Sequence, residues 1–455
     1  MTPASPSRRL PAWLDHYGMA GVLVLLCLYY SWATYKEQQP RGAAAAKRTA
    51  AQLQASGSGA RVLIVGRTTA EDTNFVRTLE ARLAVAGFKV EATVLGEPRD
   101  ARQAMQKLSD AGTKLDFIAV APECGAWTVF EDLKARFPTL GEPRLVFARN
   151  YRWPTFLNGE NLLNIANQIA VVAILAAGMT VVIITGGIDL SVGSLIALSA
   201  VLVTLLIREA GGGVNAGMAA LVACSAAGVA VSAGFGALSG LVITRFKVPP
   251  FIATLGVMLV ASGLAFKLAR GQSIYELPES FTWLGRGKGL FSIPHAVVLM
   301  AAIYVATHLM MSRTALGRRI YAVGGNDEAA RLSGVRVGRV RLFAYTFCGA
   351  LAGLGGVLLA SQLKSGSPTY GLSYELDVIA AVVVGGASLS GGEGRIFGSL
   401  VGSLIIAVIR NGMNLTGIES YDQKVVLGLV ILGAVLLDQL KRRGWPWRRR
   451  SADAY

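Results

Sequence analysis

The feature that most constrains this chain is a series of apolar stretches, each long enough to cross a bilayer, that fills the sequence after about residue 160. A helix needs about 20 consecutive, mainly apolar residues to span the hydrocarbon core of a membrane. One such stretch is predicted near the N-terminus, at 17–35. Nine more are predicted at 162–185, 190–207, 216–244, 251–269, 294–311, 340–361, 376–387, 396–415 and 425–440. The pattern predicts a polytopic all-α membrane protein of about ten transmembrane helices.

The composition supports this class. Of the 455 residues, 53% are hydrophobic and 16% are charged, which is too apolar for a soluble protein of this size. The formal net charge is +16, but the apolar body offers no soluble surface for nucleic acid, so the excess Lys and Arg are interpreted as topology signals. The four cysteines stand at unrelated spacings, which predicts neither a disulfide framework nor a metal site.

Residues 1–35 are interpreted as a cytoplasmic N-terminus and a first transmembrane helix. The apolar stretch follows Arg8 and Arg9, an arrangement that both signal peptides and retained signal anchors share. A small-residue tract at 43–46 offers a cleavage site, but it lies beyond Lys36 and far from the apolar stretch. A retained helix is therefore favoured over a cleaved signal.

Between the first apolar stretch and the second, the composition is that of a soluble domain. Residues 36–59 are interpreted as a polar, Ala-rich linker. Residues 60–158 alternate strands at 61–66, 89–95, 115–121 and 144–148 with helices at 73–86, 100–111 and 127–137. This alternation predicts an inserted α/β Rossmann-like domain with a parallel sheet. Ligands of such sheets lie beyond the carboxyl ends of the strands, which places Arg67, Asn74, Glu123 and Arg149 at the possible ligand edge.

Short basic segments set the expected orientation. The loop 312–340 and the tail 442–455 are rich in arginine, so both are expected to be cytoplasmic. Ten crossings then place the N-terminus inside as well and the α/β domain outside. The membrane core is assigned to 159–441, with 312–340 as its main cytoplasmic loop.

Two glycine-rich segments interrupt the apolar stretches, and they resemble each other. Residues 183–194 read IITGGIDLSVGS and residues 383–392 read VVGGASLSGG, which is either an internal repeat or a chance likeness. Broken helices in membranes are tolerated where neighbours or a water-lined cavity satisfy the backbone. The translocation pathway is therefore predicted to include Gly186, Gly187, Asp189, Ser191, Gly193, Gly385 and Gly386. Asp189 is expected to cap the helix that follows, and a direct contact with substrate is the alternative.

Longer motifs carry a family resemblance. They are Gly178-Met179-Thr180 with the segment 187–194, VPPFIATL at 248–255, GRRIYAVGGN at 317–326 and YELDVIAAVVVGG at 374–386. With these motifs, residues 161–442 resemble the ribose/xylose type of ABC transporter permease, the inner-membrane translocator of monosaccharide importers. The resemblance implies a type II ABC importer-like fold in the bacterial inner membrane. It also implies a separate ATPase subunit, a periplasmic sugar-binding protein and a second permease copy, identical or not.

The same resemblance implies residue roles. Glu328, Ala329, Ala330 and Gly334 resemble the Glu-Ala-Ala-x-x-x-Gly signature by which importer permeases dock their ATPase. The sequence contains no G-x-x-x-x-G-K-[ST] phosphate cradle. The chain is therefore expected to be no enzyme and to hold no cofactor, with ATP and Mg used by the partner ATPase.

The inserted domain departs from that family pattern. Its segments 73–76, 114–122 and 144–150 resemble the N-terminal lobe of periplasmic sugar-binding proteins. Because the second lobe is missing, this domain alone is not expected to capture sugar tightly, and a docking platform or a spacer is favoured over a ligand sensor. The alternatives for the whole chain are import of another small polar solute, such as a nucleoside, and a membrane receptor that uses the α/β domain as its sensor.

Overall fold

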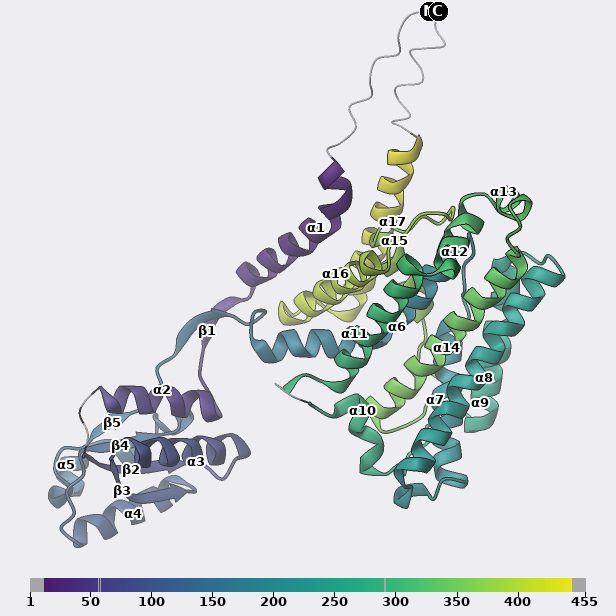
Figure 1. Ribbon diagram of the computed structural model, residues 1–455. Helices are drawn as coiled ribbons and strands as arrows, with labels where there is room; N and C mark the ends of the chain where they lie inside the picture. The colour runs from purple at the N-terminus through teal and green to yellow at the C-terminus, as the bar shows by residue number, and fades with distance from the viewer. Residues whose placement is uncertain (1–11, 56, 58, 290–291, 444–455) are drawn as a thin grey trace, which may run out of the picture. The chain divides into compact units, whose positions relative to one another are not determined.

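The computed structural model describes residues 12–55, 57, 59–289 and 292–443. The chain divides into two compact units (Figure 1). One unit, here called the α/β unit, is Tyr35–Thr155. The other, called the helical unit, combines Met1–Thr34 with Phe156–Tyr455. The α/β unit is thus inserted in the sequence between two helices of the helical unit.

The core of the α/β unit is a parallel sheet of four strands in the order β3-β2-β4-β5. Its strands are β2 (Arg61–Gly66), β3 (Lys89–Leu95), β4 (Phe117–Val120) and β5 (Arg144–Val146). The strands β2 and β4 are almost entirely buried, as expected for a parallel sheet with both faces covered. Helices α3 (Ala70–Val85) and α4 (Pro98–Asp110) connect the strands. A separate antiparallel pair, β1 (Tyr35–Gln38) and β6 (Tyr151–Pro154), joins the segments where the chain enters and leaves the unit.

Part of the predicted linker is folded. Residues 36–59 include β1 and a 13-residue helix, α2 (Gly42–Gln54), so the linker interpretation is wrong for most of that segment. The small side chains of Ala45, Ala46 and Ala50 are fully or almost fully buried with Leu53 in the core of the α/β unit. An alanine tract in sequence can be either a linker or a closely packed helix, and here the packing decides.

The predicted helix at 127–137 is also wrong. The chain instead forms two short 3-10 turns, η1 (Pro122–Cys124) and η2 (Thr128–Phe130), then α5 (Leu133–Arg136) and η3 (Pro138–Leu140). Asp132 adopts a left-handed conformation with φ of 52°, and Pro138 prevents α5 from continuing. The other two predicted helices of this unit correspond to α3 and α4.

In the helical unit, seven helices of the described residues are long and apolar enough to cross a membrane. They are α6 (Gly159–Ile184), α7 (Val192–Glu209), α8 (Met218–Arg245), α9 (Pro250–Ala269), α11 (His295–Arg313), α14 (Val337–Leu363) and α16 (Ile396–Leu415). Each corresponds to a predicted span. The structure is thus that of a polytopic helical membrane protein.

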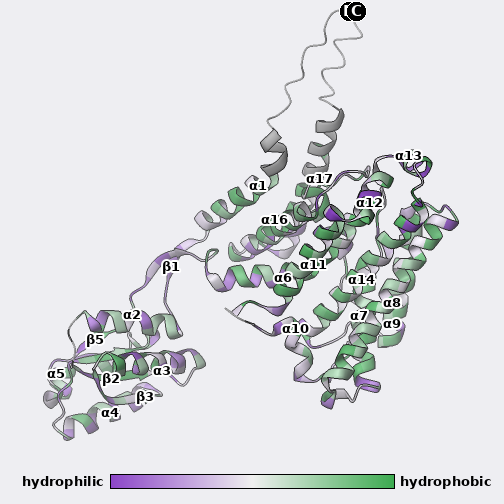
Figure 2. Ribbon diagram, in the orientation of Figure 1, coloured by the Kyte–Doolittle hydropathy of each residue, from purple (hydrophilic) through white to green (hydrophobic). Residues whose placement is uncertain are grey.

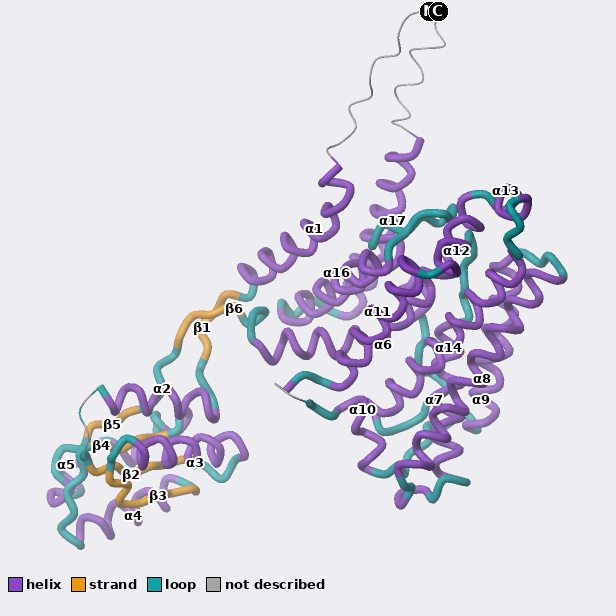
Figure 3. Tube along the Cα trace, in the orientation of Figure 1, coloured by secondary structure: helices purple, strands orange, loops and turns teal. Residues whose placement is uncertain are grey.

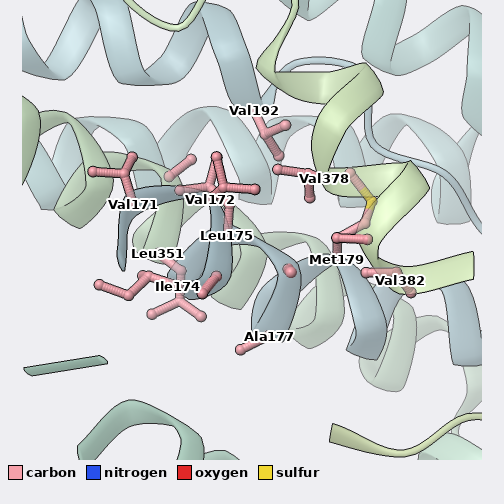
Figure 4. Packing of buried hydrophobic residues seen from close by; sticks show 14 of the residues in the cluster. Val171, Val172, Ile174, Leu175, Ala177, Met179, Val192, Leu351, Val378 and Val382 are labelled. Atoms are coloured by element: carbon pink, nitrogen blue, oxygen red, sulfur yellow. The ribbon is translucent and has the colours of Figure 1, made fainter. Parts of the chain in front are cut away.

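Burial distinguishes a central helix from peripheral ones. In its most apolar window 89% of α6 is buried, against 17% for α8 and 22% for α9. Figure 4 shows Val171, Val172 and Leu175 of α6 packed among side chains of α7, α14 and α15 (Tyr374–Val384), including Val192, Leu351 and Val378. Figure 2 shows that α8 and α9 are apolar along most of their length. Because these exposed faces are apolar, they suit contact with lipid.

The other three predicted spans are helical but fall outside this set of seven. The segment 17–35 lies mainly in α1 (Ala12–Ala33), whose apolar part is Gly18–Ala33. The segment 376–387 overlaps α15 (Tyr374–Val384), which has 11 residues. The segment 425–440 lies in α17 (Ser420–Arg443). Helix α1 packs against α16, where the ring of Tyr30 covers Gly412 and leaves no room for a Cβ atom.

The remaining elements are short. Towards one end of the helical unit lie α12 (Ala315–Gly325) and α13 (Asp327–Leu332), and α10 (Trp283–Arg286) lies towards the other (Figures 1 and 3). The 3-10 turns η4 (Gly213–Asn215) and η5 (Glu279–Thr282) complete the connections. The predicted loop 312–340 is therefore largely helical, since α12 and α13 occupy most of it.

Candidate functional site: the junction of two helix breaks

The first helix break separates α6 from α7. Helix α6 ends at Ile184, and Gly186 adopts a φ of +77°, which L side chains rarely tolerate. Asp189 is fully buried in the connecting turn. Its Oδ1 accepts hydrogen bonds from the backbone N of Ser191 at 2.9 Å and from the Ser191 Oγ at 2.6 Å. Asp189 therefore caps the turn at Ser191, the residue just before α7. The prediction that it caps the first free amides inside α7 is wrong.

The other oxygen of this carboxyl group has no such support. Among the described residues, Asp189 Oδ2 has no hydrogen-bond partner although it is buried. The thiol of Cys348 on α14 lies close to the carboxyl group. The neighbouring carbonyl of Ile188 accepts from Thr254 Oγ1 at 3.4 Å and from Tyr345 Oη at 3.5 Å. Helices α9 and α14 thus hold the turn, while one polar atom stays unpaired at a cost in free energy.

The second break separates α15 from α16. Gly385 caps α15, and Gly386 has a φ of +89°. A Cβ atom on Gly385 would overlap the backbone of Gly398 in α16, so the two helices approach each other too closely for any side chain there. Both predicted glycine pairs therefore end helices as expected.

The two breaks contact each other. The backbone N of Gly392 donates to the carbonyl of Ile184 at 2.9 Å, so the second break completes the last turn of α6. A Cβ atom on Gly391 would lie 3.0 Å from the Cα of Gly186. The two segments that resemble each other in sequence are thus neighbours in space.

Helix α12 also takes part in this contact. A Cβ atom on Gly324 would overlap the carbonyl oxygen of Ile184 and the backbone N of Gly392. Tyr321 Oη donates to the carbonyl of Gly394 at 2.8 Å. We call this contact of Ile184, Gly186, Gly324, Gly391 and Gly392 the glycine junction. It links both helix breaks directly to the helix that precedes α13.

A segment that the sequence did not single out packs along α7. Gly366 lies against Ala200 and Thr204, and Gly371 lies against the backbone of Gly193 near the start of α7. The Glu375 carboxylate also lies against Gly193, which leaves no room for a side chain. Ser191 thus precedes, and Gly193 belongs to, the first turn of a helix that begins inside the packed unit. The sequence signal for this close packing was the presence of two glycines, Gly366 and Gly371, between two predicted spans.

The predicted ATPase-docking residues lie in and after α13. The Asn326 side chain caps this helix by accepting from the backbone N of Ala329 at 2.9 Å, and Gly334 follows its end with a φ of +81°. Ala330 is only 5% exposed, whereas Glu328 points outward and makes a 3.9 Å contact with Arg331. The prediction of a short helix ended by a glycine is confirmed, and its polar face is open to a partner.

In the α/β unit, the structure brings Arg67 and Glu123 together but in an ion-pair network. Arg67 Nε donates to Asp72 Oδ2 at 2.8 Å and its guanidinium also pairs with Glu123. Arg41, just before α2, lies 3.5 Å from Glu123 and 3.7 Å from Glu71. The hydrogen bond to Asp72 raises the pKa of Arg67 further above its usual range. We call these residues the charged edge; it is occupied by the chain's own side chains.

The other two predicted residues of that edge are not part of the network. Asn74 Oδ1 accepts from Thr78 Oγ1 at 3.2 Å on α3, and its amide faces Gly42 at the start of α2. Arg149 is exposed after β5 and makes no ion pair within the described part of the chain. Sequence reasoning missed Asp72 and Arg41, because a buried acid on α3 and an arginine in a predicted linker carry no motif. No group of three or more metal-ligating side chains gathers among the residues that the structure describes.

Comparison with known proteins assigns the helical unit to a family. The model of a family described as "Branched-chain amino acid transport system / permease component" matches residues 161–435, from α6 into α17. The chain belongs to this family. The permease is therefore a multi-pass inner-membrane subunit of a transport system and not a catalytic enzyme. The matched region leaves out the α/β unit.

Curated relatives are similar over the same part of the permease. It is 45% identical to the Ribose import permease protein RbsC of Escherichia coli (strain K12) over 293 residues, which are 64% of this chain and 88% of that protein. It is 45% identical to RbsC of Bacillus subtilis (strain 168), over 67% of this chain and 92% of that protein. It is 35% identical to the Galactose/methyl galactoside import permease protein MglC of Haemophilus influenzae, over 63% and 89%. The resemblance to ribose-type ABC permeases is thereby confirmed, and no solved structure gives a significant match.

Proposed function

We propose that this permease is the membrane subunit of an ATP-binding-cassette importer that moves a monosaccharide such as ribose across the bacterial cytoplasmic membrane. The relatives support the sugar class, because proteins 45% identical to this chain are named for ribose import. A separate ATPase subunit, which uses ATP and Mg, then supplies the energy for transport. A periplasmic binding protein delivers the sugar, and a second permease copy completes the pathway.

The proposed arrangement has ten crossings, with α1, α15 and α17 added to the seven long helices. Both termini and α13 then face the cytoplasm, and the α/β unit, a Rossmann-like domain, lies outside. The basic residues around α12 and α13 support this orientation under the positive-inside rule. The packing of Tyr30 against Gly412 supports retention of α1 as a structural helix.

The glycine junction is the observation that carries the proposed mechanism. Helix α13 presents Glu328 outward for an ATPase, and α12 connects it to the backbone of Ile184 and Gly392 at the helix breaks. Because this contact leaves no space for a Cβ atom, a displacement of α12 towards the breaks must push both of them. Binding and hydrolysis of ATP in the partner would then shift the pathway between outward and inward openings by differential contact with α13.

The test compares two surface carboxylates in the purified transporter. The permease, expressed with its neighbouring genes and reconstituted in liposomes, should co-purify with a Walker-motif ATPase and take up D-ribose. Glu328→Ala should lower uptake at least tenfold while membrane insertion is retained. Glu209→Ala, an exposed carboxylate at the C-terminal end of α7, is the control and should leave uptake within twofold.

The outcomes separate the alternatives. Unchanged uptake in Glu328→Ala would refute the docking role of α13. A wild-type permease that purifies without an ATPase and shows no ATP-dependent uptake would favour the receptor function. If a nucleoside competes with ribose more strongly than other sugars do, the substrate class becomes another small polar solute.

A further inference from the structure

The helical unit contains a pocket that none of the predicted site residues line. It lies between α6, α14, α15 and α16 and has a volume of about 270 Å³. Its polar lining comes from Gln168, Gln362, Tyr374 and Arg410, and its other lining side chains are aliphatic. At roughly 30 Å³ per molecule of liquid water, this volume equals about nine waters. That is the size class of a monosaccharide.

The polar groups of the pocket are largely unused within the protein. Neither the Gln168 amide nor the Tyr374 hydroxyl makes a hydrogen bond to any other described residue. Gln362 Nε2 donates to the carbonyl of Asn167 at 3.2 Å, which leaves its oxygen available. Next to Gln168, the buried Asn167 Oδ1 has no partner among the described residues. Gln168 is exposed, and Gln362 and Tyr374 are half-buried, so their polar groups are open to a solute or to water. Only Asn167 Oδ1, which is not on the lining, is a buried atom that needs such a partner.

The one charge on the lining is already neutralised. Arg410 Nη2 donates to both oxygens of Asp377, at 2.7 and 2.8 Å. The Asp377 side chain is 15% exposed, so this pair is partly desolvated and stable in its orientation. An anionic or zwitterionic solute would have to compete with that pair. A neutral solute with several hydroxyl groups would instead use the amides and the phenol, which both donate and accept.

The pocket also lies at a defined end of the helices. Gln168 is in the first half of α6, Gln362 is next to the last residue of α14, and Arg410 is in the last two turns of α16. The glycine junction contacts the opposite end of α6, at Ile184, and the segment before α16. The pocket is therefore remote from α12 and α13. If α13 faces the cytoplasm, as proposed above, the pocket faces the side from which the sugar enters.

The geometry points to a binding site for a neutral monosaccharide, formed by Gln168, Gln362, Tyr374 and the Arg410–Asp377 pair. This site receives the sugar before the pathway opens at the two helix breaks. This inference rests on the proposed import function and adds a substrate site inside the permease. Hydrogen bonds from two amides and a phenol orient the sugar hydroxyl groups. The aliphatic walls contact its apolar face.

The test uses the complete transporter, reconstituted in liposomes with its ATPase and binding protein, and D-ribose as the probe. Gln168→Met and Gln362→Met keep the side-chain shape and remove hydrogen bonding, and Tyr374→Phe removes only the hydroxyl. Each should lower the initial uptake rate about fivefold, the effect of one hydrogen bond. The ATPase activity that the loaded binding protein stimulates should stay within twofold. Ribose transported per ATP hydrolysed should therefore fall.

Gln272→Met is the matched control, because Gln272 is exposed after α9 and outside the pocket. Its transport per ATP should equal that of the wild type. If the three pocket variants also keep the wild-type ratio, the site is refuted while the importer function stands. If wild-type permease shows no ATP-dependent ribose uptake, the import function itself is rejected. Tyr374→Phe makes the smallest structural change. If a methionine variant accumulates poorly, the transport per ATP of Tyr374→Phe decides whether the pocket binds the sugar.

Discussion

The glycine junction of the helical unit and the charged edge of the α/β unit both gather polar groups, but they are stabilised in opposite ways. At the junction, backbone atoms of Ile184, Gly324 and Gly392 contact one another because side chains are missing. At the charged edge, Arg67 and Asp72 pair because charged side chains are present and partly in contact with water.

The difference indicates what each region tolerates. A close backbone contact fails when a single carbon is added, since packed interiors have little free space. An ion-pair network at a surface loses little when one member is removed, since water and salt screen the charges. The charged edge is also filled by its own residues, which favours a docking or spacer role for the α/β unit over sugar sensing. The variants below test this contrast in order of decreasing effect.

Gly324→Ala should have the largest effect. Its Cβ atom would overlap the Ile184 carbonyl oxygen, so α12 must move away from both helix breaks. We expect a loss of about 1–3 kcal/mol in stability from overpacking and at least a tenfold loss of uptake. Thermal unfolding in detergent and uptake in liposomes measure the two effects.

The neighbouring glycine provides the control for this variant. A Cβ atom on Gly325 would meet nothing within 4 Å, so Gly325→Ala should behave as the wild type. Equal losses in both variants would show that α12 needs glycine for its backbone conformation and not for the junction.

Variants of Asp189 test whether the first helix break needs a hydrogen-bond acceptor or a charge. Asp189→Leu removes the acceptor of the Ser191 amide and hydroxyl and should cost about 1–3 kcal/mol, the price of an unsatisfied buried donor. Asp189→Asn keeps an acceptor oxygen and should retain most of the stability, measured by thermal unfolding. If Asp189→Asn stays stable but loses uptake as severely as the leucine variant, the carboxylate contacts substrate and is more than a cap.

The fold was predictable where one segment determines it. The span 396–415 coincides with α16, because Gly394 and Arg395 precede the apolar run and Thr416 and Gly417 follow it. The alanines of α2 and the segment 127–137 were misread, since burial of α2 and the left-handed Asp132 depend on the rest of the α/β unit. Tertiary packing overrides local propensity at such positions.

The functional site was predictable only in part. The glycine pairs and Asp189 interrupt apolar runs, so a local signal marks them. The role of Gly324 depends on Ile184 and Gly392, which are distant in sequence, and no single segment reveals that contact. Gln168 is a polar residue within the predicted span 162–185 and Gln362 directly follows the span 340–361, but their meeting at one pocket required the packing of α6 against α14.

At the charged edge, Arg67→Ala should have a smaller effect than Gly324→Ala or Asp189→Leu. It removes the guanidinium that pairs with Asp72 and Glu123, but the Arg67 backbone N still donates to Asp72 Oδ2 at 3.0 Å. We expect a loss of about 1 kcal/mol, reduced by screening because Arg67 is 34% exposed. Hydrogen exchange of the β2 amides in the full-length protein measures it. Arg149→Ala, which removes an exposed arginine of the same unit, should change nothing; an equal loss there would contradict the network's role.

Cys124, buried beside the charged edge, should give the smallest effect, and only at alkaline pH. Burial, together with the charge of Asp72, raises the pKa of its thiol to about 12 from a usual value of 9.0. Because the unfolded chain releases this proton first, the α/β unit should lose stability as pH rises above 9, by about 0.5–1 kcal/mol at pH 9.5. Cys124→Ala should show a correspondingly flatter dependence between pH 8 and 9.5 in the exchange of the β2 amides. Identical slopes would mean that the thiol titrates alike in the folded and unfolded chain, and that the edge admits water to the residues beneath it.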